Sequence, residues 1–425
     1  MKSIFIGIDL GTSGCRGIAI NNANTIVARS AITLPGSQRK DGHIAQNPHD
    51  WWLACHLVLD NLIEQIPRKL VKSISIAGTS GSVLLCDSDG KLRSDAYMYN
   101  DNNNIESAAQ IKQTAPKEST AHGATSGLAK CLSLLKKYQP GKHVKCLTQA
   151  DWIAGILTNQ YNFSDQNNSL KLGYDAIAQQ WPDWIQTLGC QDHLAENIYP
   201  PGSPYGSIAP QLAKAFNLPK STQIVAGTTD SVAAFLATGC NKPGDAVTSL
   251  GSTLAIKLLS EHPIYAPEYG VYSHRLGNHW LVGGASNTGG AVIKKYFSST
   301  QIADLSKLLQ TKKTTGLNYY PLLEAGERFP ISNNKLSPKL TPRPDSDLTF
   351  FQGILEGITN IEKSGYETLT TLGANYPTQI ETMGGGSVNT AWQTMRQQAL
   401  GVPISKATIT DAAFGAALLA KQGIQ

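Results

Sequence analysis

The sequence predicts an α/β protein that consists of two similar domains, and three observations support this fold class. The chain has 425 residues, which is more than one hydrophobic core usually serves. Strand and helix patterns alternate along it, as they do where helices pack on a sheet. One strand–turn–strand pattern also occurs twice, over residues 3–20 and again over residues 245–259.

The turns of the two expected hairpins have similar compositions. Residues 9–14 read DLGTSG, and residues 250–253 read LGST. Gly, Ser and Thr in a turn expose backbone N–H groups and hydroxyls with little steric bulk, which suits a phosphate group. One such turn is weak evidence, because these turns are common in β-rich proteins. Its recurrence in the second half of the chain favours two domains that together hold one nucleotide.

The other elements of the first half follow from hydrophobic periodicity and from capping residues. Apolar β-branched runs predict strands, and amphipathic runs predict helices. The strands are expected at residues 73–77 and 83–87, and the helices at residues 50–65 and 151–157. Residues 239–244 (GCNKPG) are rich in Gly, Pro and Asn, so the boundary between the domains is expected there.

The second half contains a glycine cluster directly ahead of a helix. Residues 383–387 read MGGGS, and a helix is expected over residues 390–400. A glycine turn that leads into a helix N-terminus can bind an anion or a nucleotide. Two further helices are expected over residues 348–372 and 411–421. The last helix is rich in Ala and Gly, so it is expected to pack closely against another element.

Composition and charge exclude several classes of protein. The formal net charge of +5 suits an enzyme with anionic ligands, and no run of Lys and Arg is long enough to predict a nucleic-acid site. The seven cysteines include no C-x-x-C pair, so neither a disulfide framework nor a structural zinc site is expected. No apolar stretch is long enough for a signal peptide or a membrane span. A cytoplasmic protein that binds neither nucleic acid nor a membrane is therefore expected.

The first turn carries a set of polar side chains with a chemical use. Asp9 ends the first apolar strand, and a carboxylate beside a Gly-Thr-Ser turn can hold a metal ion or its water. An aspartate that merely caps the turn is equally common. Gly11, Thr12 and Ser13 offer a backbone N–H and two hydroxyls to phosphate oxygens. Arg16 either reaches the same phosphates or lies on the surface of the second strand.

A second carboxylate follows a Gly-Thr-Thr segment in the middle of the chain. Asp230 stands where a helix of small residues is expected to begin. Its ordinary role there is to cap the helix. The alternative is a general base that faces a cleft and is kept ionised at neutral pH by the helix N-terminus. Capping preferences favour the first interpretation, and the residues alone leave both open.

Taken together, these motifs resemble those of the FGGY carbohydrate kinases, which include glycerol, gluconate, xylulose and ribulose kinases. The shared motifs, in chain order, are DLGTS from residue 9, GTTD from residue 227, LGST from residue 250 and GGGS from residue 384. Residues 42–48 (GHIAQNP) also resemble an early loop of that family. The resemblance runs from Ile4 to Leu419, which is nearly the whole chain.

The resemblance implies a fold of two actin-like (ribonuclease H-like) domains with an ATP/sugar cleft between them. The first domain would comprise residues 1–238 and 411–425, and the second residues 239–410. The C-terminal helix would thus return to the first domain.

The resemblance also implies roles for individual residues. Asp230 would be the catalytic base, Asp9 would bind Mg²⁺ or the sugar, and Thr12 would contact the γ-phosphate of ATP. The residues expected to bind ATP are Gly11, Thr12, Ser13, Arg16, Gly251, Ser252, Thr253, Gly384, Gly385, Gly386 and Asn389.

The segment expected to recognise the sugar departs from the family pattern. Residues 97–104 (YMYNDNNN) keep an aspartate, Asp101, but no arginine lies near it. Residues 78–82 (GTSGS) offer hydroxyls where other members have different side chains. Both segments resemble the short ribulose/xylulose-type kinases of plants and cyanobacteria, so D-ribulose is the expected acceptor and D-xylulose the alternative. The residues expected to bind the sugar are Asp9, Ser80, Asp101 and Asp230.

Two other hypotheses are an actin-like ATPase without sugar kinase activity and a sugar-binding protein that has lost catalysis. The first has no need of a base such as Asp230. The second should lack Asp9, Asp230 or a phosphate-loop glycine, and all of these are present. The preferred prediction is therefore a kinase that takes ATP, Mg²⁺ and a small sugar, as a monomer or a homodimer.

Overall fold

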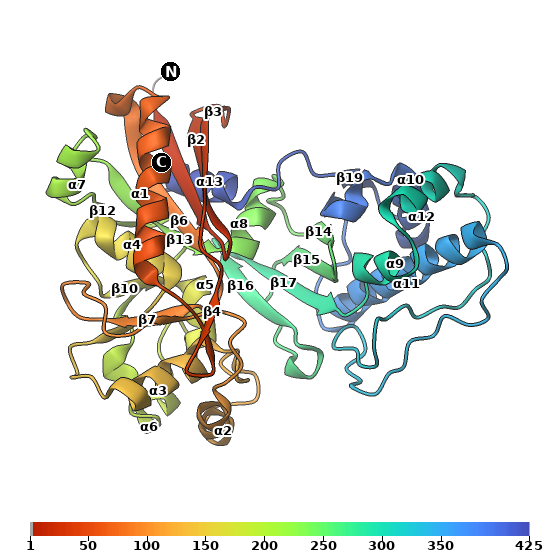
Figure 1. Ribbon diagram of the computed structural model, residues 1–425, viewed down its shortest axis with the longest axis horizontal. Coiled ribbons are helices and arrows are strands. Elements are labelled where there is room, and N and C mark those ends of the chain that lie inside the picture. The colour runs from red at the N-terminus through yellow and green to blue at the C-terminus, as the bar shows by residue number, and fades with distance from the viewer. Residues whose placement is uncertain (1–2, 425) are drawn as a thin grey trace. The chain divides into compact units, whose positions relative to one another are not determined.

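The computed structural model describes residues 3–424, which divide into two compact units (Figure 1). The first unit takes the chain up to Ala237, together with His274–Gly277 and the chain from Ile409 onward. The second unit comprises Thr238–Ser273 and Asn278–Thr408.

Residues His274–Gly277 belong to the first unit, whereas the expected boundaries placed them in the second domain. The carboxamide of Asn167 explains this grouping. Its Nδ2 donates to the carbonyl of Arg275 at 3.0 Å, and its Oδ1 accepts from the backbone N–H of Arg275 at 2.8 Å. One side chain thus satisfies both backbone groups of a residue that lies 108 positions further along the chain. Such a contact depends on the tertiary fold, so no local sequence pattern predicts it.

The main sheet of the first unit has six strands in the order β12-β13-β6-β1-β2-β3. Their bounds are β1 Ile4–Leu10, β2 Gly14–Asn21, β3 Ile26–Thr33, β6 Val71–Gly78, β12 Pro204–Ser207 and β13 Gln223–Thr229. β1, β6 and β13 are parallel, whereas β2 is antiparallel to both β1 and β3. The hairpin predicted at the N-terminus is the β1–β2 pair.

The three parallel strands of this sheet end at the same level. Leu10 pairs with Gly78, and Gly78 pairs with Thr229. The residues that follow these strands therefore emerge at one edge of the sheet, and they include Asp230. Ligands of open α/β sheets bind outside the carboxyl ends of the strands, so this edge is where a site is expected.

Helices cover both faces of the sheet (Figure 1). α1 (Pro48–Glu64) and α4 (Gln149–Thr158) pack on the face that carries Ile6, and α13 (Ala412–Gln422) packs on the face that carries Phe5. Every residue of β1 is buried. A strand that is covered on both faces is apolar throughout rather than alternating, which agrees with the IFIGIDL sequence of β1.

The C-terminal helix α13 approaches the sheet unusually closely. A Cβ atom at Gly7 would lie 2.1 Å from the carbonyl oxygen of Ala413 and 2.1 Å from the backbone nitrogen of Ala417. Ser73 Oγ also donates a hydrogen bond of 2.5 Å to the carbonyl of Ala420. The close packing predicted from the Ala and Gly content of this helix is confirmed.

The first unit contains a smaller, five-stranded sheet in the order β4-β5-β8-β7-β9. Its strands are β4 Gln38–Lys40, β5 His43–Gln46, β7 Val83–Cys86, β8 Ala96–Tyr97 and β9 Lys145–Thr148. α3 (Gly127–Tyr138) packs on this sheet and forms a separate core with Val83 and Leu85. A short turn, residues 79–82, joins β6 of the main sheet to β7 of this one.

The remaining elements of the first unit are short. The helices are α2 Ile105–Thr114, α5 Gln166–Ser169, α6 Trp184–Thr187, α7 Pro210–Ala215 and α8 Asp230–Ala237. The strands are β10 Phe163–Asp165 and β11 Asn197–Tyr199, which pair in parallel. α8 begins directly after β13, so Asp230 is its first residue.

The second unit repeats the topology of the first. The strands of its sheet are β14 Asp245–Leu250, β15 Leu254–Ser260, β16 Tyr272–Leu276, β17 His279–Ser286, β18 Gln379–Met383 and β19 Ile404–Lys406, although the end of β16, from His274, groups with the first unit. They form one sheet in the order β16-β17-β15-β14-β18-β19. As in the first unit, the first strand of an antiparallel hairpin pairs in parallel with a later strand, which pairs in parallel with a further one; here these strands are β18 and β19. The repeat predicted from the two hairpin turns is confirmed, because both sheets have the same strand order around their first hairpin.

The described part of the second unit has four α-helices, which are α9 Gly290–Tyr296, α10 Ser299–Leu308, α11 Asp347–Thr371 and α12 Thr390–Leu400. A buried ion pair holds two of them, α11 and α12, to its sheet. Arg396 of α12 binds Glu362 of α11 through two hydrogen bonds of 2.6 Å. Arg396 also donates to Thr382 of β18, and Thr248 of β14 donates to Glu362. The two strands that lead to the glycine turns are thereby fixed to both helices.

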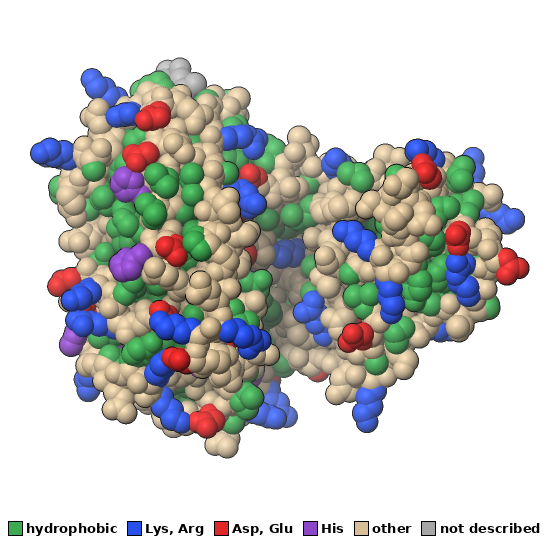
Figure 2. All heavy atoms as spheres, viewed as in Figure 1, with side chains coloured by type: hydrophobic (Ala, Val, Ile, Leu, Met, Phe, Trp, Pro, Cys, Tyr) green, Lys and Arg blue, Asp and Glu red, His purple; other side chains and the backbone are tan. Residues whose placement is uncertain are grey.

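Charged side chains are spread over the face of the molecule that Figure 2 shows. On the face seen in Figure 2, Lys and Arg side chains lie among acidic and uncharged ones rather than in one patch. Among residues 3–424, no helix combines the length and the apolar character that crossing a membrane requires.

Candidate active site

A cavity of about 450 Å³ opens at the edge of the first unit where the parallel strands end. Its lining residues are Asp9, Arg16, Asp230, Ser231, Ala234, Thr410, Asp411 and Ala412. They come from the end of β1, the start of β2 and the N-termini of α8 and α13. The structure therefore brings together Asp9 and Asp230, which are 221 positions apart in the chain (230 − 9).

Asp9 is buried in this cavity with one oxygen unsatisfied. Its Oδ2 lies 3.6 Å from Nη1 of Arg16, but its Oδ1 has no hydrogen-bond partner among the described residues. Burial, followed by repulsion from Asp230 and Asp411, raises the pKa of Asp9 to about 7, against the opposing effect of Arg16. A buried carboxylate oxygen without a partner is costly unless a ligand completes it. The arrangement suits a cation or a donor hydroxyl that binds to Oδ1.

Asp230 lies at the N-terminus of α8 and is half-buried. Its Oδ1 accepts a hydrogen bond of 2.6 Å from the backbone N–H of Ser231. The strand before it is fixed from the side, because Asn167 Nδ2 donates to Thr228 Oγ1 at 3.0 Å. The partial positive charge of a helix N-terminus favours the ionised carboxylate. Asp230 is thus an acceptor held at the wall of a cavity.

Asp411 is a third carboxylate in this cavity, and the sequence did not single it out as a site residue. It is the N-cap of α13, where its Oδ1 accepts from the backbone N–H of Ala413 at 3.1 Å. The available signal was an aspartate directly before the last helix, which predicts only a cap. Its place beside Asp9 depends on the return of α13 to the first unit.

The first glycine turn is held rigidly by the chain around it. The N–H of Gly11 donates to the carbonyl of Gly14 at 2.9 Å. Gln46 Nε2 donates to the carbonyl of Thr12 at 2.8 Å, and Trp51 Nε1 donates to Gln46 Oε1 at 2.8 Å. Thr12 is half-buried and Ser13 is exposed, so both hydroxyl-bearing residues are accessible on a fixed backbone. The sequence predicted this turn but not the Gln46 and Trp51 support.

Ser80 and Asp101 have different environments. Ser80 is half-buried in the turn that follows β6, at the same edge of the sheet as Asp9 and Asp230. Asp101 is only 1% exposed, and its Oδ1 accepts from the N–H of Ile44 at 2.9 Å.

The other oxygen of Asp101 is also occupied by groups of the chain. Its Oδ2 lies 2.9 Å from His43 Nδ1 and 2.8 Å from Asn104 Nδ2. Asp101 therefore joins two loops, and the prediction that it contacts the sugar is not supported, because its oxygens already have partners.

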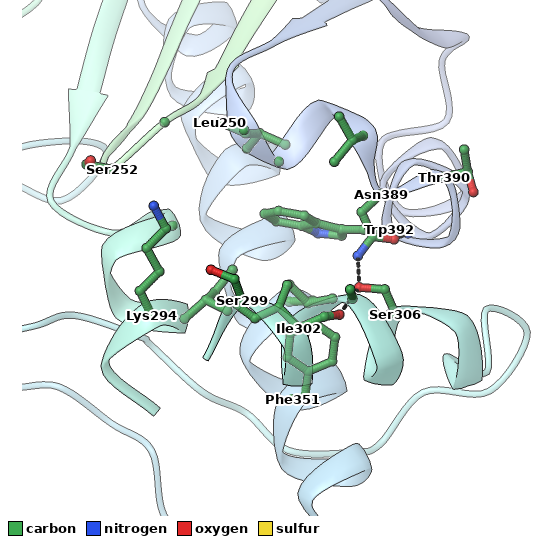
Figure 3. Close-up of a pocket in the computed structure, with 18 of the residues that line it drawn as sticks. Leu250, Ser252, Lys294, Ser299, Ile302, Ser306, Phe351, Asn389, Thr390 and Trp392 are labelled. Atoms are coloured by element: carbon green, nitrogen blue, oxygen red, sulfur yellow. Dashed lines mark hydrogen bonds between the residues drawn. The ribbon is translucent and has the colours of Figure 1, made fainter. Parts of the chain in front are cut away.

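The second unit has its own cavity, of about 680 Å³, beside the second glycine turn (Figure 3). Its lining residues are Leu250, Gly251, Ser252, Gly290, Ile293, Lys294, Ser299, Ile302, Ala303, Ser306, Lys307, Phe351, Leu355, Gly385, Gly386, Val388, Asn389, Thr390 and Trp392. In Figure 3, Trp392 and Ile302 form apolar walls, and Lys294 extends from α9 on the side where Ser252 lies. An apolar cavity of this size with a few polar groups at one end suits a nucleoside with its phosphates.

The glycine cluster at residues 384–386 has two functions. Gly384 has φ +86°, and a Cβ there would lie 2.7 Å from the carbonyl oxygen of Leu250, so it allows β14 to approach. Gly386 is equally crowded, since a Cβ would lie 2.7 Å from Leu250 Cβ and 2.9 Å from Trp392 Cζ3. Gly385 has open space around its Cβ position. Gly385 and Gly386 line the cavity, whereas Gly384 does not.

Asn389 lines the same cavity, but its side chain is already bonded. Its Oδ1 accepts from the N–H of Trp392 at 2.9 Å as the N-cap of α12, and its Nδ2 donates to Ser306 Oγ at 2.8 Å (Figure 3). Asn389 therefore joins α10 to α12 as well as forming part of the wall. Thr253 is not among the lining residues, although Gly251 and Ser252 are.

The sequence missed most of the residues that shape the second cavity. Lys294, Ile302, Ser306 and Trp392 come from three helices and belong to no short motif. The lining residues that the sequence did identify belong to or closely follow short glycine motifs; they are Gly251, Ser252, Gly385, Gly386 and Asn389. Residues that lie on helices and line a cavity can be identified only when the packing of those helices is known.

Comparisons with known proteins agree with this arrangement. Residues 4–237 match the N-terminal domain, and residues 246–422 the C-terminal domain, of the FGGY family of carbohydrate kinases. A xylulose kinase of Escherichia coli K12 is 24% identical over 450 residues, which cover 98% of this chain and 90% of that protein. A gluconokinase of Bacillus subtilis is 23% identical over 437 residues, which cover 93% of this chain and 82% of that protein.

The fold is also found among solved structures. A crystal structure described as a xyloylose kinase from Brucella ovis superposes with a TM-score of 0.89 and 24% identity, covering 99% of this chain and 90% of that one. Both units thus have the actin-like, ribonuclease H-like topology of such kinases. Since the two family models together span nearly all of the chain, the protein is a carbohydrate kinase that phosphorylates a sugar with ATP. The chain belongs to the FGGY family of carbohydrate kinases and contains both of its domains.

Proposed function

We propose that this kinase transfers the γ-phosphoryl group of ATP to a hydroxyl of D-ribulose, with D-xylulose as the alternative acceptor. One observation supports the roles given to Asp9 and Asp230. Both residues line the same cavity, and Oδ1 of Asp9 has no hydrogen-bond partner among the described residues. The choice of D-ribulose rests on the segments 78–82 and 97–104, which resemble the short ribulose/xylulose-type kinases. D-xylulose is retained because several relatives are xylulose kinases.

Asp230 acts as the general base in this proposal. It accepts the proton of the sugar hydroxyl while the hydroxyl oxygen bonds to the γ-phosphorus and the bond to the β-phosphate oxygen breaks, which releases ADP. Asp9 and Ser80 bind the sugar near Asp230. The backbone N–H groups and hydroxyls of Thr12 and Ser13 bind phosphate oxygens.

Asp9 also fits a role in holding Mg²⁺. The support is its buried, unsatisfied Oδ1, since hard divalent cations prefer carboxylate oxygens. The described residues contain no group of three acidic, His or Cys side chains placed to hold a metal alone, but Mg²⁺ in kinases uses one or two carboxylates with water and substrate phosphates. When bound, the ion neutralises charge on the transferring phosphoryl group.

The donor site of the proposal is the cavity of the second unit. The adenosine occupies the apolar part between Ile302 and Trp392, and Gly251 and Ser252 bind the phosphates. Arg16 is assigned to Asp9 rather than to the phosphates, because its Nη1 lies 3.6 Å from that carboxylate.

The proposal is tested by ADP release from Mg-ATP with a panel of acceptors: D-ribulose, D-xylulose, gluconate and glycerol. D-ribulose is expected to give the highest kcat/KM. A higher value for gluconate or glycerol would refute the ketopentose assignment. Equal ADP release with and without every acceptor would refute sugar phosphorylation by this chain.

The donor site is tested separately by filling its cavity at Gly385. The Cβ position of Gly385 faces open space, so Gly385→Val is expected to raise the KM for ATP at least about tenfold. The KM for the sugar and the unfolding midpoint should stay close to wild type. Gly386→Ala serves as the comparison, because its Cβ would meet Leu250 and Trp392 and should lower stability instead. An unchanged KM for ATP in Gly385→Val would exclude this cavity as the donor site.

A further inference from the structure

Lys130 of α3 is completely buried, at 0% exposure. Lysines usually keep the ammonium in water and bury only the aliphatic chain. Here the Nζ atom donates hydrogen bonds to the backbone carbonyls of Thr125 at 2.6 Å, Gly81 at 2.9 Å and Tyr99 at 3.3 Å. Three segments of the chain therefore converge on one amino group.

The acceptors of Lys130 are all neutral. A buried ammonium without a bonded carboxylate is costly, so its retention calls for a specific reason. An ammonium has three hydrogens, which is the number of carbonyls around Nζ, whereas a neutral amine has only two. The geometry thus fits the protonated form.

The carbonyl of Gly81 belongs to the turn that contains Ser80. This turn is bonded on its other side, since Thr79 donates to Gln149 Oε1 through its N–H at 2.9 Å and through its hydroxyl at 2.8 Å. Thr79 Oγ1 and Ser82 Oγ are 2.6 Å apart. Gly81 has φ +84° and supplies the carbonyl to Lys130.

The other two carbonyls belong to neighbouring loops. Tyr99 is bonded to the same turn, because its N–H donates to Ser82 Oγ at 2.9 Å. Thr125 directly precedes Ser126, the N-cap of α3. Lys130 is therefore the common donor beneath three loops, one of which presents Ser80 at the sheet edge where Asp9 and Asp230 lie.

We propose that Lys130 is a positioning residue for the sugar: its ammonium fixes the Ser80 turn and the two adjacent loops in the geometry that binds the acceptor. It touches neither substrate and acts through Ser80. The inference rests on the proposed function, because it assigns Ser80 to the sugar.

The titration of Lys130 gives this proposal a distinctive signature. Burial, and secondarily the charge of Lys171, lowers the pKa of Lys130 to about 7, while Asp101 and Cys146 act in the opposite direction. These three are the charged or titratable groups that shift the pKa of Lys130. Loss of the proton leaves two hydrogens for three carbonyls, so the KM for the sugar should rise as the pH increases through about 7.

The same titration should make the protein more stable as the pH rises, although it weakens binding of the sugar. The unfolded lysine titrates near 10.5, so between about pH 7 and pH 10 the unfolded chain binds more protons than the folded one. Lys130 therefore makes the free energy of unfolding rise with pH in that window. A Lys130→Met variant should lack this increment.

The decisive experiment compares Lys130→Met with Lys145→Met. Lys145 also donates to two backbone carbonyls, those of Asp192 and Leu194, but it is paired with Glu196 and contacts none of the three loops. Lys130→Met is expected to raise the KM for D-ribulose about tenfold or more. It should also remove the rise in this KM above pH 7, whereas the titration of Asp9, whose pKa is also about 7, acts in the opposite direction and remains. The KM for ATP and the rate of ADP release without sugar should change less than about twofold. Lys145→Met should leave all these values near wild type.

A second variant tests the proposal even if Lys130→Met does not fold. Lys171 is half-exposed, and its side chain lies beside the Ser80 turn. Lys171→Met removes a positive charge near Lys130, so the midpoint of the KM–pH curve should move upward by about 0.5 pH unit. An unmoved midpoint would overturn the proposal, as would an equal rise in the KM values for sugar and ATP in Lys130→Met.

Failure of the proposed function would be visible before any variant is compared. In that case the wild type would release ADP at the same rate with and without each sugar. If instead the wild type phosphorylates a sugar and Lys130→Met retains its KM and its pH profile, only the Lys130 proposal fails.

Discussion

Replacing Asp230 by asparagine is expected to lower kcat for sugar phosphorylation by about 10²–10⁴-fold, the range that a positioned general base contributes. Asparagine has the same shape and keeps an oxygen for the N–H of Ser231, so the start of α8 should not change. It cannot take up the proton of the sugar hydroxyl. The measurement is sugar-dependent ADP release at saturating ATP and sugar, with circular dichroism to confirm the fold.

Asp411→Asn is the matched control for this prediction. Asp411 lines the same cavity, also begins a helix, and keeps its N-cap function as asparagine. It removes one negative charge near Asp9 without removing the base, so its effect on kcat should be less than about tenfold. Equal losses in the two variants would show that the charge of the cavity, and not proton transfer by Asp230, limits the reaction.

The largest effect on stability is expected from Gly7→Ala. The added methyl group would lie 2.1 Å from backbone atoms of Ala413 and Ala417, and backbone atoms of a packed helix cannot rotate away as a side chain can. The helix must therefore move off the sheet, which we expect to cost about 3 kcal/mol or more in the free energy of unfolding. Denaturant unfolding of the purified variant measures this loss.

Gly36→Ala provides the comparison for Gly7→Ala. No atom lies within 4 Å of the Cβ position at Gly36, so its unfolding midpoint should be close to that of the wild type. If the free energies of unfolding of Gly7→Ala and Gly36→Ala differed by less than about 1 kcal/mol, the close contact between α13 and β1 would be incorrect.

The local parts of the fold could be predicted from the sequence. The hairpins β1–β2 and β14–β15 join neighbouring strands through short turns, so their patterns lie within about twenty residues. α11 and α12 follow from periodicity and from caps in the same way. The order of strands in each sheet was not derivable from such patterns, since β13 joins β6 across a long stretch of chain. The resemblance to a known family implied the two actin-like domains, but no strand order was predicted.

The residues of the candidate site also fall into two groups: those that a short motif identifies and those whose place depends on the tertiary fold. Asp9, Asp230 and the glycines were identified because each belongs to a short motif whose chemistry is visible in the sequence. Asp411 was missed because its motif is that of an ordinary helix cap. The sequence could not show that Asp101 is buried and bonded to His43 and Ile44, because these contacts come from a loop nearly sixty positions away. The contact of Asp101 with the sugar stays a prediction.

The return of α13 to the first sheet has a consequence for synthesis on the ribosome. Phe5, Ile18 and Ile20 form a buried cluster with residues of this helix, so this part of the sheet stays uncovered by the helix until α13 has emerged. The nascent first unit therefore presents an apolar surface throughout the translation of residues 238–408. Partly folded chains with such a surface are prone to aggregation and are recognised by chaperones. The first unit is thus complete only after α13 has been synthesised, which follows the whole of the second unit.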